Sequence, residues 1–189
     1  MQKRSHKLLA GSLLKDCDGF RARRFELAFL FGSFQPDCNP LTYLKGSLRG
    51  RKLRGHNYGN SGGYIRAHIA HLQRRERWTM WQYYTLGKLT HYLADAFTYP
   101  HNENYPDSLL DHRRYEDGLR EYLAVYLGAH AAKPSVFPEG DVISALEELH
   151  RQYMESVADM CRDARYILEA TGLLMDRLLP QQACAAAGI

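Results

Sequence analysis

The stretch HYLADAFTYPHNENYPDSLLDHRRYE, residues 91–116, contains two histidine–acid pairs that share the same spacing. His91 and Asp95 are four residues apart, and His112 and Glu116 repeat that interval. Residues four apart on a helix project from the same face, about one turn from each other. The stretch therefore predicts two helices, each presenting a histidine and a carboxylate side by side.

A break separates the two pairs. Pro100 biases Tyr99 away from helical conformation and is expected to end the first helix. His101 then lies in the turn, where its side chain can point back toward either pair. Helix bundles build metal sites in their interior from such pairs on facing helices. Imidazoles and carboxylates without a nearby thiolate favour Zn²⁺, with Mn²⁺ or Fe²⁺ as alternatives. A single histidine–acid pair, by contrast, is common surface decoration.

Helical periodicity dominates the rest of the chain, and strand-like alternation is nearly absent. We expect an all-α, single-domain bundle of six or seven helices. The predicted helices span residues 5–16, 22–31, 64–76, 79–98 and 106–128, followed by one long or two closely joined helices within 141–179. A long loop rich in Gly, Pro and Asn is expected over residues 34–63. The domain is placed at residues 1–180, with 181–189 as a flexible tail.

The composition suits one hydrophobic core and no membrane-spanning helix. The chain has 189 residues, 45% of them apolar, but lacks any run of about 18 uncharged apolar residues. The basic start has only a short apolar run and no small-residue cleavage site, so a signal peptide is not indicated. A cytoplasmic location is expected, or secretion if the true start lies upstream. The four cysteines form no CxxC pair, which argues against a thiolate zinc site or a disulfide framework.

A basic run lies in the long loop. KGSLRGRKLRGH, residues 45–56, holds five lysines and arginines and no acid. Such a run could attract a phosphate-bearing substrate, although a solvated loop is the simpler explanation.

Three motifs upstream, SHKLLA, FLFGSFQPD and RGHNY, join two within the opening stretch, HYLADAFTYPHN and HRRYE. In this order they resemble the zinc-dependent phospholipase C family of bacteria, whose fold is shared with the single-strand-specific zinc nucleases. The resemblance covers most of residues 5–125. It implies an α-helical domain that holds zinc ions in a cleft.

Carried onto this chain, the resemblance implies two sets of zinc ligands and a bridging carboxylate. The first ion would be held by Asp37, His56, His91 and Asp95, and the second by His101, His112 and Glu116. Asp95 would also bridge to a third ion, to which His6 contributes. In the family an N-terminal tryptophan completes that third site through its amino and carbonyl groups. Residue 1 is Met here, so the third site would lack this tryptophan. Two or three zinc ions are therefore expected.

The function implied by the resemblance is phosphodiester hydrolysis of phospholipase C type. A zinc-bound hydroxide near Asp95 would attack the phosphorus of a phospholipid, because zinc lowers the pKa of water toward neutrality. Asp37 is expected to be a metal ligand and general base, with a purely structural ligand as the alternative. The expected partners are a phospholipid or other phosphodiester substrate and a membrane surface touched peripherally, with no obligate protein partner.

Two other functions stay open on the sequence. A nuclease or nucleotidase on the same fold would benefit from the basic run, because nucleic acid is a polyanion. A non-catalytic scaffold stapled by metal is the other alternative. His68 and His71 belong to none of the five motifs and are expected to be surface residues.

Overall fold

The computed structural model describes residues 1–38, 58–102, 105, 108–132 and 140–180. This part of the chain forms seven α-helices and two short 3₁₀ turns, with no strand. The elements are α1 (Lys3–Asp16), α2 (Arg23–Phe34), η1 (Gln35–Cys38), α3 (Tyr58–Gln73), α4 (Met80–Ala96), η3 (Tyr99–His101), α5 (Leu109–Ala129), α6 (Val142–Glu155) and α7 (Met160–Leu178). The predicted all-α bundle is therefore confirmed.

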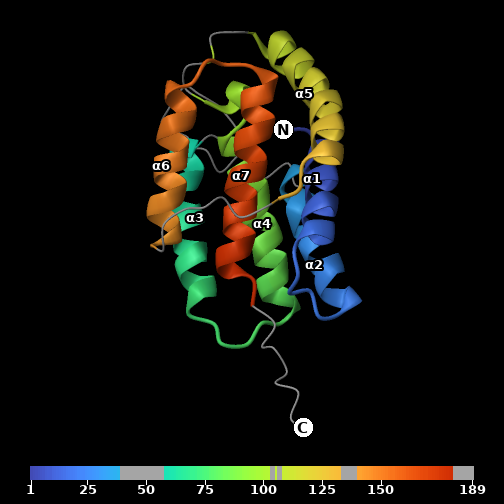
Figure 1. The fold of residues 1–189 in the computed structure, drawn as a ribbon, viewed down its shortest axis with the longest axis vertical. Coiled ribbons are helices and arrows are strands. Elements are labelled where there is room, and N and C mark those ends of the chain that lie inside the picture. The colour runs from blue at the N-terminus through green and yellow to red at the C-terminus, as the bar shows by residue number, and fades with distance from the viewer. Residues whose placement is uncertain (39–57, 103–104, 106–107, 133–139, 181–189) are drawn as a thin grey trace.

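Two helices form the centre of the bundle, α4 and α7 (Figure 1). In this view α3 and α6 lie on one side of them, and α1, α2 and α5 lie on the other. Helix α4 is buried along most of its length, and its start is closed by a capping box between Thr79 and Gln82. Helix α2 makes the most extensive contact with α4 among the described elements. Functional side chains on α4 are thus held by packing on several faces.

Several helix boundaries differ from the sequence prediction. Helix α3 begins at Tyr58 rather than at residue 64, although the added turns contain three glycines, which have low helix propensity. Ser61 in this segment is 5% exposed, so packing outweighs the local preference. Helix α5 begins at Leu109 rather than at residue 106, because the Ser108 side chain accepts a hydrogen bond from the Asp111 backbone and caps the helix there.

The C-terminal helical region consists of two helices. Helix α6 ends at Glu155, and the Asp159 carboxylate accepts a hydrogen bond from the Arg162 backbone N–H at 2.6 Å, which starts α7. Residues 181–189 lie outside the described residues, so the tail boundary stays a prediction. In the part of the chain that the structure covers, no helix is both long and apolar enough to cross a membrane.

Candidate metal centre

The centre begins with two residues on one buried face of α4. His91 and Asp95 are 0% and 1% exposed, and His91 Nε2 lies 3.4 Å from Asp95 Oδ2. The other ring nitrogen of His91, Nδ1, donates a hydrogen bond of 3.0 Å to the carbonyl of Ser33 in α2. This bond directs the Nε2 atom toward Asp95, and histidines that bind metals are commonly oriented in this way by their second ring nitrogen.

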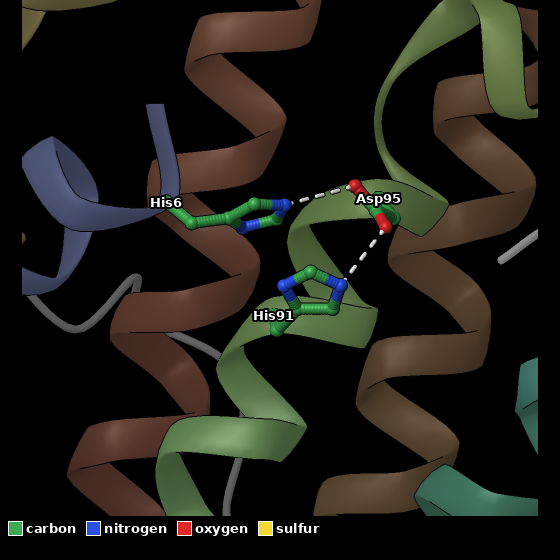
Figure 2. A group of neighbouring side chains, drawn as sticks. All are labelled: His6, His91 and Asp95. Atoms are coloured by element: carbon green, nitrogen blue, oxygen red, sulfur yellow. Dashed lines mark ion pairs between the residues drawn. The ribbon is translucent and has the colours of Figure 1, made fainter. Parts of the chain in front are cut away.

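His6 of α1 completes a first cluster with these two residues (Figure 2). Its Nε2 atom lies 3.2 Å from Oδ1 of Asp95, so the two histidines approach different oxygens of one carboxylate. The rings of His6 and His91 stack with their centroids 3.9 Å apart. One potential ligand atom from each of the three residues lies within 4.8 Å of the others. A single ion placed among them could contact all three.

Asp37 lies beside this cluster in η1, just after α2. Its Oδ2 atom is 3.9 Å from His6 Nε2, and its Oδ1 atom is 3.8 Å from His91 Nε2. Burial raises the pKa of Asp37, and the nearby His6 offsets part of that shift. Among the described residues, His6 Nε2 and Asp37 Oδ2 are buried without a hydrogen-bond partner. Each buried polar atom without a partner lowers the stability of the fold by about 1–3 kcal/mol. A divalent cation would give both atoms a partner, so this donor set fits such an ion.

The second cluster joins η3 to α5. His101 Nε2 lies 3.0 Å from Oε1 of Glu116, and His112 Nε2 lies 3.2 Å from the same oxygen. The turn at Pro100 brings His101 back to face α5. These side chains are 13%, 29% and 14% exposed for His101, His112 and Glu116, in contrast to the nearly sealed first cluster. The second cluster is therefore the part of the centre that solvent reaches more easily.

The two clusters meet at Asp95. His101 Nδ1 lies 4.0 Å from Asp95 Oδ2. The Met1 amino group sits between the clusters, 2.5 Å from Asp95 Oδ1, 2.9 Å from His101 Nε2 and 3.2 Å from Glu116 Oε1. Burial lowers the pKa of this amine, but the two carboxylates outweigh burial and raise it to about 10. The space between the clusters thus accommodates a positive charge.

Both carboxylates at this junction are held ionised. Burial alone would raise the pKa of Asp95, but the Met1 amino group, His101 and the histidines of the first cluster hold it well below the ordinary value. The pKa of Glu116 is lowered in the same way, because the Met1 amino group and hydrogen bonds from its two histidines outweigh burial. Ionised carboxylates and imidazole nitrogens are the oxygen and nitrogen donors that zinc takes.

Asp163 of α7 supports the second cluster from behind. It is fully buried, and its Oδ2 atom accepts hydrogen bonds from the Tyr99 backbone N–H at 2.8 Å and the Tyr115 hydroxyl at 2.9 Å. Its Oδ1 atom accepts from the Tyr153 hydroxyl at 2.9 Å and from Arg162 at 3.0 Å. Tyr99 begins η3 and Tyr115 precedes Glu116, so this carboxylate ties both parts of the cluster to α7. Sequence reasoning missed Asp163, because no motif or spacing relates it to the ligands.

The structure brings together seven of the eight predicted ligands. They are His6, Asp37, His91 and Asp95 around the first cluster, and His101, His112 and Glu116 in the second. His6 lies against His91 in the first cluster. His56 and the basic run of residues 45–56 lie outside the described residues. The assignment of each residue to a particular ion stays a prediction.

Comparison with known proteins gives one family match. The family model described as zinc dependent phospholipase C matches residues 5–160. This range contains all eight predicted ligands and ends before Asp163. No curated protein and no solved structure matches the chain.

Proposed function

Because this chain belongs to the zinc-dependent phospholipase C family, we propose that it hydrolyses the phosphodiester bond of a phospholipid at the centre described above. The family membership supports zinc-dependent phospholipase C chemistry in general terms. The proposal adds the site residues and the substrate class, a phospholipid cleaved on the glycerol side to release a phosphorylated headgroup.

One observation carries the proposal, the position of Asp95 between the two clusters. Its oxygens lie 3.2 Å from His6 Nε2 and 3.4 Å from His91 Nε2 in the first cluster, and 4.0 Å from His101 Nδ1 in the second. A carboxylate shared by two sets of ligands is suited to hold two cations close together. Paired cations are a common arrangement for displacement at phosphorus.

The residues divide into two binding sets in this proposal. His6, His91 and Asp95, with Asp37 beside them, would hold zinc in the first cluster, and His56 remains a predicted further ligand. His101, His112 and Glu116 would hold zinc in the second cluster. When bound, zinc supplies a Lewis acid that activates water near neutral pH and offsets negative charge on the phosphoryl oxygens.

The charge of the site explains why a phosphodiester would need bound cations there. Asp95 and Glu116 are ionised and face the same space. Two carboxylates repel a phosphate group, especially where burial weakens the screening by water. Binding of an anionic substrate is therefore expected only when the histidine–carboxylate sets are loaded with metal.

Asp37 is the proposed general base. Its side chain is 11% exposed, whereas the side chains of Asp95 and both histidines of the first cluster are at most 1% exposed. Asp37 is thus the carboxylate of that cluster best placed to take a proton from a water molecule at the substrate. A purely structural ligand role is the alternative. Asp37→Asn separates the two: retained zinc with lost turnover supports the base, and full turnover contradicts it.

The proposed function is tested by metal content and turnover together. We expect purified protein to contain at least one zinc ion per chain by elemental analysis and to hydrolyse a short-chain, water-soluble phosphatidylcholine. A chelator should abolish turnover, and added zinc should restore it. Less than one metal ion per chain would contradict the ligand assignment. Full metal occupancy without turnover on any phosphodiester would instead support the metal-stapled scaffold.

A nuclease on the same fold is the second candidate, favoured by the five basic residues of the run at 45–56. Nucleic acid binding releases counterions, so its strength falls steeply with salt. Turnover on single-stranded DNA that declines steeply with ionic strength, with no turnover on phosphatidylcholine, would favour the nuclease.

A further inference from the structure

A groove of about 450 Å³ lies between α3 and α4, away from the ligand clusters. Its walls include His68, His71 and Arg74 on the α3 side, and Trp81, Tyr84 and Lys88 on α4. Among the described residues that line it, none carries a carboxylate. A concave surface with basic and aromatic side chains and no acid is suited to an anionic group such as a phosphate.

A row of four aromatic rings adjoins this groove. Phe34 and Phe31 of α2 are followed by Tyr84 and Trp81 of α4, with successive ring centroids 5.7, 5.9 and 5.2 Å apart. Phe31 is 53% exposed and Trp81 is 67% exposed. Half-exposed rings from two helices in one continuous row form an apolar surface strip, which is uncommon on a protein without a partner there. We call these four residues the aromatic row.

Cations lie at both ends of the aromatic row. At one end, Lys7 Nζ lies 4.4 Å from the centre of the Phe34 ring. At the other end, the exposed segment 74–77 holds three arginines and one glutamate just before Trp81. Aromatic side chains flanked by lysine and arginine are typical of surfaces that rest at a lipid headgroup layer. The rings enter the interface, and the cations attract anionic headgroups.

Two ring contacts connect the groove to the first cluster. Tyr64, which lines the groove, contacts Tyr92 edge-on with ring centroids 4.8 Å apart. Tyr92 in turn contacts His91 edge-on at 5.3 Å. Trp81 lies about 20 Å from Asp95 along the axis of α4, at 1.5 Å per residue. One end of this face is therefore remote from the metal centre, and at the other end Tyr92 separates Tyr64 from His91.

We propose that the aromatic row and the α3–α4 groove together form the face by which this protein docks on a lipid surface that carries anionic headgroups. The choice of a lipid surface, rather than another polyanion, rests on the proposed phospholipase function. Docked in this way, the protein places the Tyr64 end of the groove, which Tyr92 links to His91, against the layer that holds the substrate. The Trp81 end anchors the helix pair.

Co-sedimentation with vesicles tests this face without requiring turnover. Wild-type protein is expected to bind vesicles of phosphatidylcholine mixed with phosphatidylglycerol more strongly than vesicles of phosphatidylcholine alone. Trp81→Ala and the double variant Arg74→Glu with Lys88→Glu should each partition about tenfold less onto the mixed vesicles. The matched controls are Val125→Ala on α5, where the side chain is 76% exposed, and Arg165→Glu, an exposed residue of α7. Both controls should bind as wild type does.

Turnover on a short-chain, water-soluble phosphatidylcholine separates docking from catalysis. Trp81→Ala should retain wild-type turnover on this substrate and lose turnover on mixed vesicles.

Wild-type protein that hydrolyses the soluble substrate but does not bind mixed vesicles would overturn the docking proposal alone. Vesicle binding that Trp81→Ala and the charge reversals leave unchanged would overturn the assigned face. Binding of single-stranded DNA in place of vesicles, abolished by the charge reversals, would overturn the lipid assignment in favour of nucleic acid. Wild-type protein that binds mixed vesicles but hydrolyses none of the substrates would contradict only the proposed function.

Discussion

Gly32 of α2 and Gly87 of α4 lie against each other where the two helices cross. A Cβ atom added at Gly32 would lie 2.2 Å from the Tyr84 carbonyl oxygen, and one added at Gly87 would lie 2.2 Å from the Phe29 carbonyl oxygen. Both distances are far below van der Waals contact, so only glycine permits this approach of the backbones. The crossing places the Ser33 carbonyl within hydrogen-bonding distance of His91, and Ser33 lies four residues before Asp37. The two glycines therefore support the first cluster.

Gly87→Ala should push α2 away from α4. We expect the free energy of unfolding to fall by about 3 kcal/mol or more, because the clash is with backbone atoms that cannot move independently. Zinc affinity should also fall, since the Ser33 carbonyl loses its position at His91. Denaturant unfolding and a zinc titration measure the two effects. Gly11→Ala and Gly63→Ala are matched controls, because a Cβ at either position meets nothing within 4 Å. In both controls the free energy of unfolding should rise by about 0.5–1 kcal/mol, because alanine replaces glycine within a helix.

Metal removal should destabilise the protein as well as inactivate it. A ligand present at about 100 times its dissociation constant stabilises the folded state by about 2.7 kcal/mol. For a chain of this size, that corresponds to a Tm change of roughly 5–10 °C. A thermal melt with and without chelator is the measurement, and readdition of zinc should restore the Tm. An unchanged Tm after complete removal of metal would mean that the clusters do not hold it.

Asp95→Asn should remove the link between the clusters. The asparagine amide carries no charge and has only one oxygen, so it cannot serve both clusters as the carboxylate does. We therefore expect zinc affinity to fall by about 100-fold or more, a larger loss than is typical for a residue that only supports a ligand. Equilibrium dialysis followed by elemental analysis measures it. Glu121→Gln on α5 is the control, because the Glu121 side chain is 79% exposed and contacts neither cluster. If Asp95→Asn binds zinc as tightly as this control, Asp95 is not a ligand.

Asp163→Asn should weaken both the fold and the second cluster. The side-chain amide replaces one carboxylate oxygen by an NH2 group, which at the Oδ2 position would point at the Tyr99 N–H and the Tyr115 hydroxyl, both donors in the wild type. Removing one partner of a buried ion pair costs about 3–5 kcal/mol, here at the contact with Arg162. We expect a loss of that size in urea unfolding, with lowered zinc occupancy. Tyr115→Phe, which removes one hydrogen bond only, should cost about 1 kcal/mol. Asp176→Asn on α7, at a side chain 39% exposed, should cost nothing measurable.

His150 of α6 should make stability depend on pH in the acid range. Burial lowers the pKa of His150 from 6.5 to about 4, although a hydrogen bond to the backbone of Ala96 opposes the shift. Below pH 6.5 the unfolded chain binds a proton that the folded chain does not, so stability is lost as pH falls toward 4. The loss from this residue reaches at most about 3 kcal/mol.

The matched variants are His150→Gln and His130→Gln. The first should remove the contribution of His150, so that unfolding free energy falls less steeply between pH 6.5 and 4 than in wild type. The second changes an exposed histidine at the end of α5, and its free energy of unfolding should depend on pH as steeply as in wild type. Identical slopes for wild type and His150→Gln would show that His150 is not the titrating group.

Much of the site could be predicted from local spacing. The four-residue intervals within α4 and α5 place His91 with Asp95 and His112 with Glu116, because helix geometry is the same wherever a helix forms. The break at Pro100, which frees His101, is also local, since it follows from the ring of one residue. The family resemblance supplied the remaining ligands, and the family match over residues 5–160 supports the same class of function.

The tertiary structure decided which of these groups meet. His6 stacks on His91, and Asp95 lies between the two clusters. Asp163, which lies beyond the matched range, holds η3 and α5 from α7. Packing also extended α3 through residues of low helix propensity and made the Gly32–Gly87 crossing. The sequence by itself determined the helices and the ligand pairs within each, because those depend on backbone geometry over a few residues. Contacts between helices depend on how whole faces pack around one core, and no spacing along the chain contains that information.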